Sequence, residues 1–170
     1  MDEKTPVEIE RKYIIRIPDL KALEAQEGYT VSKIEQTYLE SDPCVTHRVR
    51  KRVYENRVVY TETKKVRIDK ISSYEDEEQI DESEYLRLLE RIKNGTHTLT
   101  KTRHTFVFLG QTFEVDIYPE WTSSCIMETE LTSRETEVKI PSFISVVKEV
   151  SGDKRYTNAS MSYEFPDELI

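Results

Sequence analysis

Apolar and charged residues alternate along much of this chain, most clearly in the segment Val7-Glu8-Ile9-Glu10-Arg11-Lys12. Residues two apart on a β-strand point to the same side, so Glu8, Glu10 and Lys12 would share one face and the two aliphatic residues the other. The same analysis predicts strands over 6–16, 30–40, 45–54, 57–67, 73–80, 98–109, 111–118 and 124–132. Most of them are joined by short turns and are therefore expected to be antiparallel.

Three other segments show the apolar spacing or the end signals of helices. Pro18-Asp19 is expected to open a short helix that continues to about Gln26. Asp81 is a predicted N-cap, with Glu84 completing a capping box, for a helix that ends at Asn94-Gly95. Pro141 is expected to begin a third helix that ends at Gly152, and the tail from residue 153 is expected to be a loop.

Charge on the predicted strands is sorted by sign. Bases lie two apart at Arg48, Arg50 and Arg52 and at Lys101 and Arg103, and acids at Glu75 and Glu77, Glu114 and Asp116, and Glu128 and Glu130. Any one such segment has an ordinary interpretation, a half-buried strand with a solvated outer face. Surfaces normally intersperse the two signs, however, so repeated sorting favours ligand binding. Carboxylates beside an ammonium can hold a divalent cation and an anion together, as in a metal-bound polyphosphate.

Composition and charge narrow the possibilities. A chain of 170 residues fits one domain over 1–170, and 36% hydrophobic against 34% charged residues predicts a thin core or a polar interior. A net charge of −8 argues against binding nucleic acid at the surface, and no apolar run is long enough for a membrane helix. Residues 1–4 do not resemble a secretion signal, so Cys44 and Cys125 are expected to be reduced thiols of a cytoplasmic protein.

These elements together predict an α+β, mainly β fold: an eight-stranded antiparallel closed barrel with about three covering or plugging helices. In this arrangement the charged faces line the interior, and the helices cover the outward apolar faces. A lumen of bare charges is costly unless acids, bases, metal and ligand compensate one another.

The motifs, in this order, resemble the CYTH domain of the triphosphate tunnel metalloenzyme superfamily. Glu8, Glu10 and Lys12 match its ExExK strand, and the RxR, ExE, KxR, ExD and ExEL strands follow in sequence at the pairs named above. Residues 153–158 resemble its closing loop and plug. The chain departs from the family's pattern at two positions. Ser73 replaces an arginine, so one phosphate contact is expected to be either missing or supplied by Arg52. Thr157 replaces a plug lysine.

The resemblance implies a tunnel that binds a triphosphate with Mg²⁺ or Mn²⁺. The implied phosphate ligands are Lys12, Arg48, Arg50, Arg52, Lys65, Lys101, Arg103 and Arg155. The implied metal ligands are Glu8, Glu10, Asp116, Glu128 and Glu130, with Lys65, Lys101, Glu128 and Glu130 as catalytic residues and Glu75, Glu77 and Glu114 as supporting residues. Oxygen donors of this kind suit both metals.

The implied activity is hydrolysis of a terminal phosphoanhydride, with inorganic tripolyphosphate as the preferred substrate. Other activities of the superfamily stay open: the class IV adenylate cyclase, thiamine triphosphatase or RNA triphosphatase type, or a non-catalytic module that binds polyphosphate or nucleotides. The expected partner is a small-molecule triphosphate, without a membrane and without nucleic acid other than an RNA 5′-triphosphate end. The chain is expected to be a monomer or a homodimer.

Overall fold

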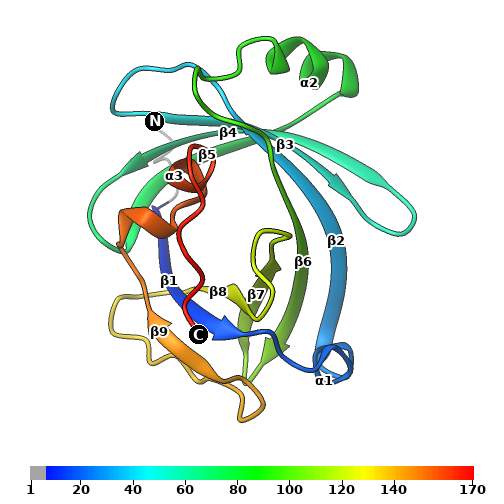
Figure 1. Ribbon diagram of the computed structural model, residues 1–170, viewed down its shortest axis with the longest axis vertical. Helices are drawn as coiled ribbons and strands as arrows, with labels where there is room; N and C mark the ends of the chain where they lie inside the picture. Colours follow the sequence, from blue (N-terminus) through cyan, green and yellow to red (C-terminus); the bar gives the residue numbers. More distant parts are fainter. Residues whose placement is uncertain (1–6) are drawn as a thin grey trace, which may run out of the picture.

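The computed structural model describes residues 7–170, in which nine strands form one antiparallel sheet that closes on itself (Figure 1). The strands are β1 (Val7–Arg16), β2 (Glu27–Tyr38), β3 (Thr46–Val53), β4 (Val58–Arg67), β5 (Ser72–Ile80), β6 (Leu99–Phe108), β7 (Gln111–Ile117), β8 (Ser124–Glu130) and β9 (Val146–Glu149). Their order is β5-β4-β3-β2-β6-β7-β8-β1-β9, and β5 also pairs with β1. The predicted ring of eight antiparallel strands is thus confirmed. Residue 6 of the first expected strand and the N-terminal residues 1–4 lie outside the described residues.

Strand β1 closes the ring. One of its edges pairs with β8 along its length, while the other pairs first with β5, through Val7 and Ile9, and then with β9, through Tyr13 to Ile15. The strands are strongly tilted. Directly paired residues can be followed from strand to strand around the ring, starting at Lys12 of β1. This row continues through Glu128, Glu114, Thr105 and Thr30 on β8, β7, β6 and β2, and at β2 it lies beyond the residues that pair with β3. Strong tilt and stagger widen a ring of a given strand number, so this interior has room for a ligand.

The outward apolar residues are covered as expected, although only partly by helices. Helix α1 (Leu20–Glu24) places Leu23 against β6, β7 and β8, where the loop residues Phe143 and Ile144 complete the cover. Helix α2 (Glu82–Leu89) packs Tyr85 and Leu88 over Leu39 and Val49, outside β2 and β3. Figure 1 shows α2 outside the ring, beside β3 and β4. Burial of these apolar faces leaves the opposite, charged faces turned to the interior.

One end of the interior is closed by an apolar cluster. Ile14, Leu99 and Ile126 continue the inward faces of β1, β6 and β8, and they are fully or almost fully buried. They pack with residues of the C-terminal segment, including Tyr156 of the short 3₁₀-helix η1 (Lys154–Tyr156) and Met161 of helix α3 (Asn158–Met161). The C-terminal segment therefore forms the floor of the interior, and the charges lie above it.

Two of the predicted helices need correction. The third does not exist: residues after Pro141 form a turn and then β9, because Val146 and Val147 suit a strand and β1 offers an edge that β5 leaves unpaired. A helix forms instead at α3, where a loop was expected. Helix α2 begins as predicted, since the Asp81 carboxylate accepts a hydrogen bond from the Glu84 amide at 2.8 Å. It ends at Leu89 rather than near Asn94, and Glu84 pairs with Arg87, so the capping box is half formed.

Across residues 7–170, no helix has both the length and the apolar character needed to cross a membrane.

Candidate active site

The interior holds a cavity of about 880 Å³ lined largely by charged side chains. The predicted site residues that line it are Glu8, Glu10, Lys12, Arg48, Arg50, Arg52, Lys65, Glu75, Glu77, Arg103, Glu114, Glu128 and Glu130. Alternation along the strands brings these residues to one face of each strand, and closure of the ring brings the faces together. Lys101, Asp116 and Arg155 were also predicted here, and they do not line the cavity.

Strand β3 supplies a wall of arginines. Arg50 is only 8% exposed, and its guanidinium donates to the Gln36 amide oxygen at 2.9 and 3.2 Å, so its side-chain partner is neutral. Burial lowers the pKa of Arg50 to about 9, and the like charges of Arg48 and Arg103 contribute in the same direction. A buried cation without a carboxylate partner is costly. An anion in the cavity could supply the counter-charge that the direct partner of Arg50 does not provide.

The two flanking arginines are also only loosely neutralised. Arg48 lies 3.8 Å from the Glu75 carboxylate, and its buried Nε has no hydrogen-bond partner. Arg52 donates from Nε to the Ser32 hydroxyl at 2.8 Å, a neutral partner. Because these two guanidinium groups have only a neutral or a distant partner, some of their N–H donors remain free and could form bidentate contacts to phosphate oxygens.

The opposite wall, from β1 and β8, carries carboxylates. Glu10 and Glu130 are direct partners across these two strands, as are Lys12 and Glu128. Burial raises the pKa of Glu10 to about 7, and repulsion from Glu128 adds to the rise. Burial alone would raise the pKa of Glu128 too, but Lys12, whose ammonium lies 3.1 Å away, together with Arg103 and Lys101, lowers it to about 2. This wall therefore contains Glu128, which is firmly ionised, and Glu10, which would need a further cation nearby to be fully ionised near neutral pH.

Lys65 of β4 joins the acidic wall to the basic one. Its ammonium contacts Glu8 at 2.9 Å and Glu75 at 3.5 Å, and Glu75 is in turn the nearest acid to Arg48. Glu77 accepts a hydrogen bond from the Thr63 hydroxyl at 2.9 Å. Glu75 and Glu77 thus contact neighbouring polar groups of the cavity wall, and their supporting role stays a prediction.

A buried ion network lies on the inward faces of β6 and β7, and of its members Arg103 lines the cavity. Both Asp116 oxygens are occupied, by Lys101 at 2.7 Å and by the Arg103 guanidinium at 2.7 and 2.8 Å. Burial would raise the pKa of Asp116, but these two cations hold it well below its usual range. Arg103 also pairs with Glu114 and reaches Glu128 at 3.8 Å. Asp116 here acts as the counter-ion of two bases. Its metal role and the catalytic role of Lys101 stay predictions that this geometry does not favour.

The plug segment differs in detail from the expectation. Arg155 pairs with Asp153 at 2.8 Å and its side chain is 66% exposed, whereas the neighbouring Lys154 lines the cavity. These residues form one turn of 3₁₀-helix, and the orientation of that turn determines which of the two side chains faces the cavity. A strand pattern that repeats every two residues does not predict this orientation. Asn158 also lines the cavity, and its side chain accepts a hydrogen bond from the Tyr118 hydroxyl at 2.6 Å.

Sequence reasoning missed three further residues that line the cavity or hold its walls. Arg67 continues the inward alternation of β4 two residues beyond Lys65, which is a usable signal. Tyr38 lines the cavity, and Gln36 holds Arg50 from the same face of β2. Glutamine and tyrosine carry no formal charge, so a search for charges two apart does not find them.

The cavity's donor set fits a hard divalent cation in chemistry. It contains glutamate oxygens at Glu8, Glu10, Glu128 and Glu130, and Mg²⁺ and Mn²⁺ prefer oxygen ligands with phosphate and water completing the shell. Within residues 7–170, no three acidic, histidine or cysteine side chains converge closely enough to hold a metal by themselves. A metal here would need substrate oxygens as part of its shell.

Solved structures with this fold include a triphosphatase. The inorganic triphosphatase NE1496 is 26% identical over 94% of this chain and 97% of its own, with a TM-score of 0.59. PH1819 from Pyrococcus horikoshii OT3 is 21% identical over 75% of this chain and 80% of its own, with a TM-score of 0.56. HpAC1 from Hippeastrum, described as having a dominant triphosphatase activity, is 16% identical over 75% and 81% of the two chains, with a TM-score of 0.53.

Neither a protein-family model nor a curated protein matches the sequence significantly. The ring of eight strands, the charged interior and the similarity to NE1496 nevertheless agree with the motif order read from the sequence. The resemblance to the CYTH and triphosphate tunnel superfamily is confirmed.

Proposed function

We propose that this protein is a divalent-metal-dependent hydrolase that cleaves the terminal phosphoanhydride of a triphosphate, with inorganic tripolyphosphate as its substrate. The observation that carries this proposal is Arg50, a buried guanidinium with a neutral partner, between two other arginines that face a wall of glutamates. A metal-bound polyphosphate supplies both charges that this cavity lacks. The similarity to NE1496, a protein named as an inorganic triphosphatase, supports the same substrate class.

The arginine wall would bind and orient the phosphate chain. Arg48, Arg50 and Arg52 present three guanidinium groups along one strand, so together they could contact several oxygens of a phosphate chain. Phosphoryl transfer depends mainly on positioning and charge stabilisation, so this wall would supply much of the catalytic effect. A bound divalent cation would neutralise phosphate oxygens and lower the pKa of a coordinated water.

Glu130 lines the cavity and is the residue that we assign as proton acceptor. Burial raises its pKa, and repulsion from Glu8 and Glu114 raises it further, whereas Lys12 holds Glu128 firmly ionised. In the proposed reaction the water oxygen forms a bond to the terminal phosphorus, and the bond to the bridging oxygen breaks. Glu130 takes the proton of the water, and orthophosphate and pyrophosphate are the products.

A nucleotide substrate is the principal alternative. Among the described residues that line the cavity, Tyr38 is the one aromatic ring, so stacking contacts for a base are sparse. The basic residues already account for the phosphates. Tripolyphosphate is therefore preferred over ATP and thiamine triphosphate.

Phosphate release from a panel of substrates tests the proposal. The panel contains tripolyphosphate, ATP, thiamine triphosphate and longer polyphosphate, each with Mg²⁺ or Mn²⁺, and cyclic AMP is assayed alongside. We expect the highest kcat/KM for tripolyphosphate. Turnover should disappear on exhaustive chelation and return when either metal is added. A higher kcat/KM for ATP would replace the substrate assignment, and full activity without metal would contradict the metal assignment.

A further inference from the structure

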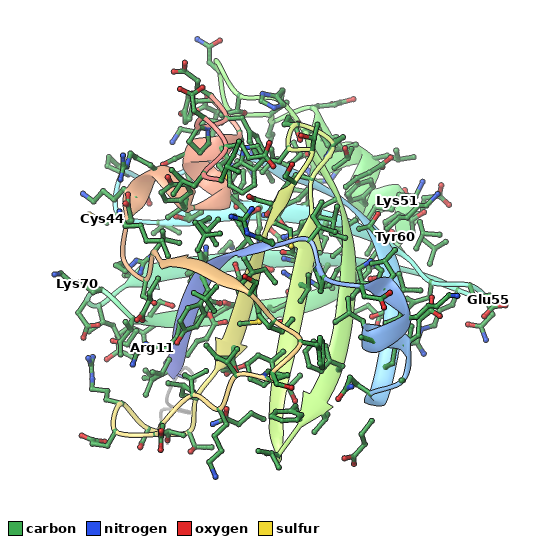
Figure 2. The ribbon with its side chains drawn as sticks, turned by 60° about the horizontal axis from the view of Figure 1, so that its bottom comes forward. Arg11, Cys44, Lys51, Glu55, Tyr60 and Lys70 are labelled. Atoms are coloured by element: carbon green, nitrogen blue, oxygen red, sulfur yellow. The ribbon has the colours of Figure 1, made fainter. Side chains whose placement is uncertain are left out.

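Arg67 marks a second basic corner of the cavity, away from the arginine wall. It is the last residue of β4, it points to the interior like Thr63 and Lys65, and its direct partner on β5 is Ser73. A small pocket adjoins the main cavity here. Its charged lining consists of four bases, Lys12, Lys65, Arg67 and Lys70, and two acids, Glu10 and Asp153, and Ser73 and the turn at Gly152 also line it. Figure 2 shows Lys70 on the opposite side of the molecule from Glu55, which lies at the tip of the β3–β4 hairpin.

Arg67 itself is not neutralised by a neighbouring acid, whereas Lys12 pairs with Glu128 and Lys65 pairs with Glu8 and Glu75. The Arg67 guanidinium donates to the backbone carbonyls of Lys70, at 3.0 Å, and Asp69, at 3.4 Å, and in the described part of the chain it forms no ion pair. The nearby Asp69 carboxylate pairs with Arg134 instead. Arg67 therefore remains available to an anion inside the cavity.

The corner is also held in position. The Asp69 side chain accepts hydrogen bonds from the Ile71 and Ser72 amides at 3.0 and 3.1 Å, which fixes the β4–β5 turn. On the other side, Gly152 packs so closely that an added Cβ would lie 2.9 Å from Cβ of Lys70. The carbonyls that orient Arg67 are thus part of a locked turn, so little ordering is needed when a ligand binds.

From this geometry we infer that Arg67, with Lys12 and Lys65, forms a separate phosphate subsite. This subsite rests on the proposed function and extends it, because it would bind the phosphoryl group at the end of the chain remote from Arg50. Its ligand is a terminal phosphoryl group of an inorganic polyphosphate. Because 67 and 73 are direct partners on neighbouring strands, an arginine at either position would present its charge to the same volume.

A charge transposition tests the subsite. Arg67→Ser removes the guanidinium, and the double variant Arg67→Ser with Ser73→Arg returns it from the neighbouring strand. Lys64→Ser is the matched control, since Lys64 is an exposed residue on the same strand facing outward. For each protein we would measure KM and kcat with tripolyphosphate and Mg²⁺, and the Kd for tripolyphosphate by calorimetry.

We expect Arg67→Ser to raise KM and Kd about tenfold, the loss of one charge-assisted contact, with kcat changed far less. The double variant should recover most of the affinity, and Lys64→Ser should match the wild type. Unchanged affinity in Arg67→Ser, or a double variant no better than the single one, would overturn the subsite while leaving the proposed function standing. A wild-type protein that neither binds nor cleaves tripolyphosphate would overturn both. Thermal unfolding of each variant separates loss of contact from loss of fold.

Discussion

At the residue scale, this interior holds opposite charges that satisfy one another only in part. Arg50 has a neutral partner, while Glu10 has a carboxylate as a close neighbour. Each arrangement is unfavourable in the protein without ligand, and each becomes favourable when a metal-bound polyanion enters. Under the proposed function, affinity for the ligand would therefore come at a cost to the stability of the free protein.

Removal of the Arg50 charge should weaken substrate binding. We expect Arg50→Ala to raise the KM for tripolyphosphate about tenfold or more, because hydrogen bonds to charged groups contribute about 1.5–3 kcal/mol. Added Mg²⁺ should not restore it. Lys51→Ala is the control, since Lys51 faces outward on the same strand. Steady-state kinetics decide the matter, and an unchanged KM would contradict a phosphate role for Arg50.

Neutralisation of Glu128 should slow turnover instead. Glu128→Gln is nearly isosteric, and we expect kcat to fall about 100-fold or more, as for removal of one catalytic charge. Excess metal should recover part of the loss. Glu149→Gln is the matched control, because Glu149 is a surface carboxylate that pairs with Arg11 at 2.6 Å on the outer side of β1. If the two variants had equal kcat, the assignment of Glu128 would be wrong.

The raised pKa of Glu10 predicts a pH-dependent stability without metal. Between its usual value of 4.5 and about 7, the folded protein holds a proton that the unfolded chain releases. The free energy of unfolding should therefore fall as pH rises through this window. Thermal unfolding between pH 5 and 8 with a chelator present measures this effect. Glu10→Gln should flatten the profile, and a profile identical to the wild type would contradict the assignment.

At the element scale, two tight turns contain a glycine with positive φ, and they differ in the space around that glycine. Gly110, in the β6–β7 hairpin, and Gly152, after β9, both have φ near 75°, a region that disfavours other residues. Space around Gly110 is open, whereas a Cβ at Gly152 would meet both Cβ and the carbonyl of Lys70. The turn after β9 is thus fixed by packing against the β4–β5 turn as well as by its own backbone.

Alanine at these two glycines should separate the two effects. We expect Gly110→Ala to lower the free energy of unfolding by about 1 kcal/mol, the cost of positive φ alone. Gly152→Ala should cost more, and it should also raise the KM for tripolyphosphate because it displaces the turn that orients Arg67. Chemical denaturation and kinetics on the pair check both parts. Equal stability losses with unchanged KM would show that the contact with Lys70 is unimportant.

At the scale of the whole molecule, the net charge of −8 says little about the ligand. Closure of the ring concentrates positive charge on one interior wall, so an acidic protein can still present a basic site for a polyanion. The C-terminal segment closes one end of the ring through an apolar cluster, with the Trp121 indole donating to the Pro166 carbonyl at 3.0 Å. Ligand access is thereby confined to the charged part of the interior.

Tripolyphosphate with metal should stabilise the entire fold. A ligand at 100 times its Kd that binds only the native state adds about 2.7 kcal/mol, which for a domain of this size raises the unfolding midpoint by roughly 5–11 °C. The stabilisation should need both components, because each compensates a different wall. Differential scanning calorimetry with tripolyphosphate alone, metal alone and both together measures it. A shift with tripolyphosphate alone as large as with both would contradict joint binding.

The sequence by itself determined which face each strand turns inward and the order in which the charged strands follow one another. Alternation with period two, as at Glu8, Glu10 and Lys12, is a local property, and burial of the opposite apolar face enforces it. The hairpins around residues 55 and 110 were equally local, since turn residues between alternating runs decide them. These properties sufficed for the eight-stranded ring and for most of the residues that line its cavity.

Only the tertiary structure determined which charged residues pair, which of them line the cavity, and which secondary structure the segments with ambiguous patterns adopt. Asp116 and Lys101 face inward as predicted, yet they pair with each other, and Asp116 also pairs with Arg103, so that neither lines the cavity. Residues 141–150 form a turn and a strand because β1 has a free edge there, and short apolar runs fit either structure. Contacts between distant segments set these outcomes, and alternation along a single strand carries no information about them.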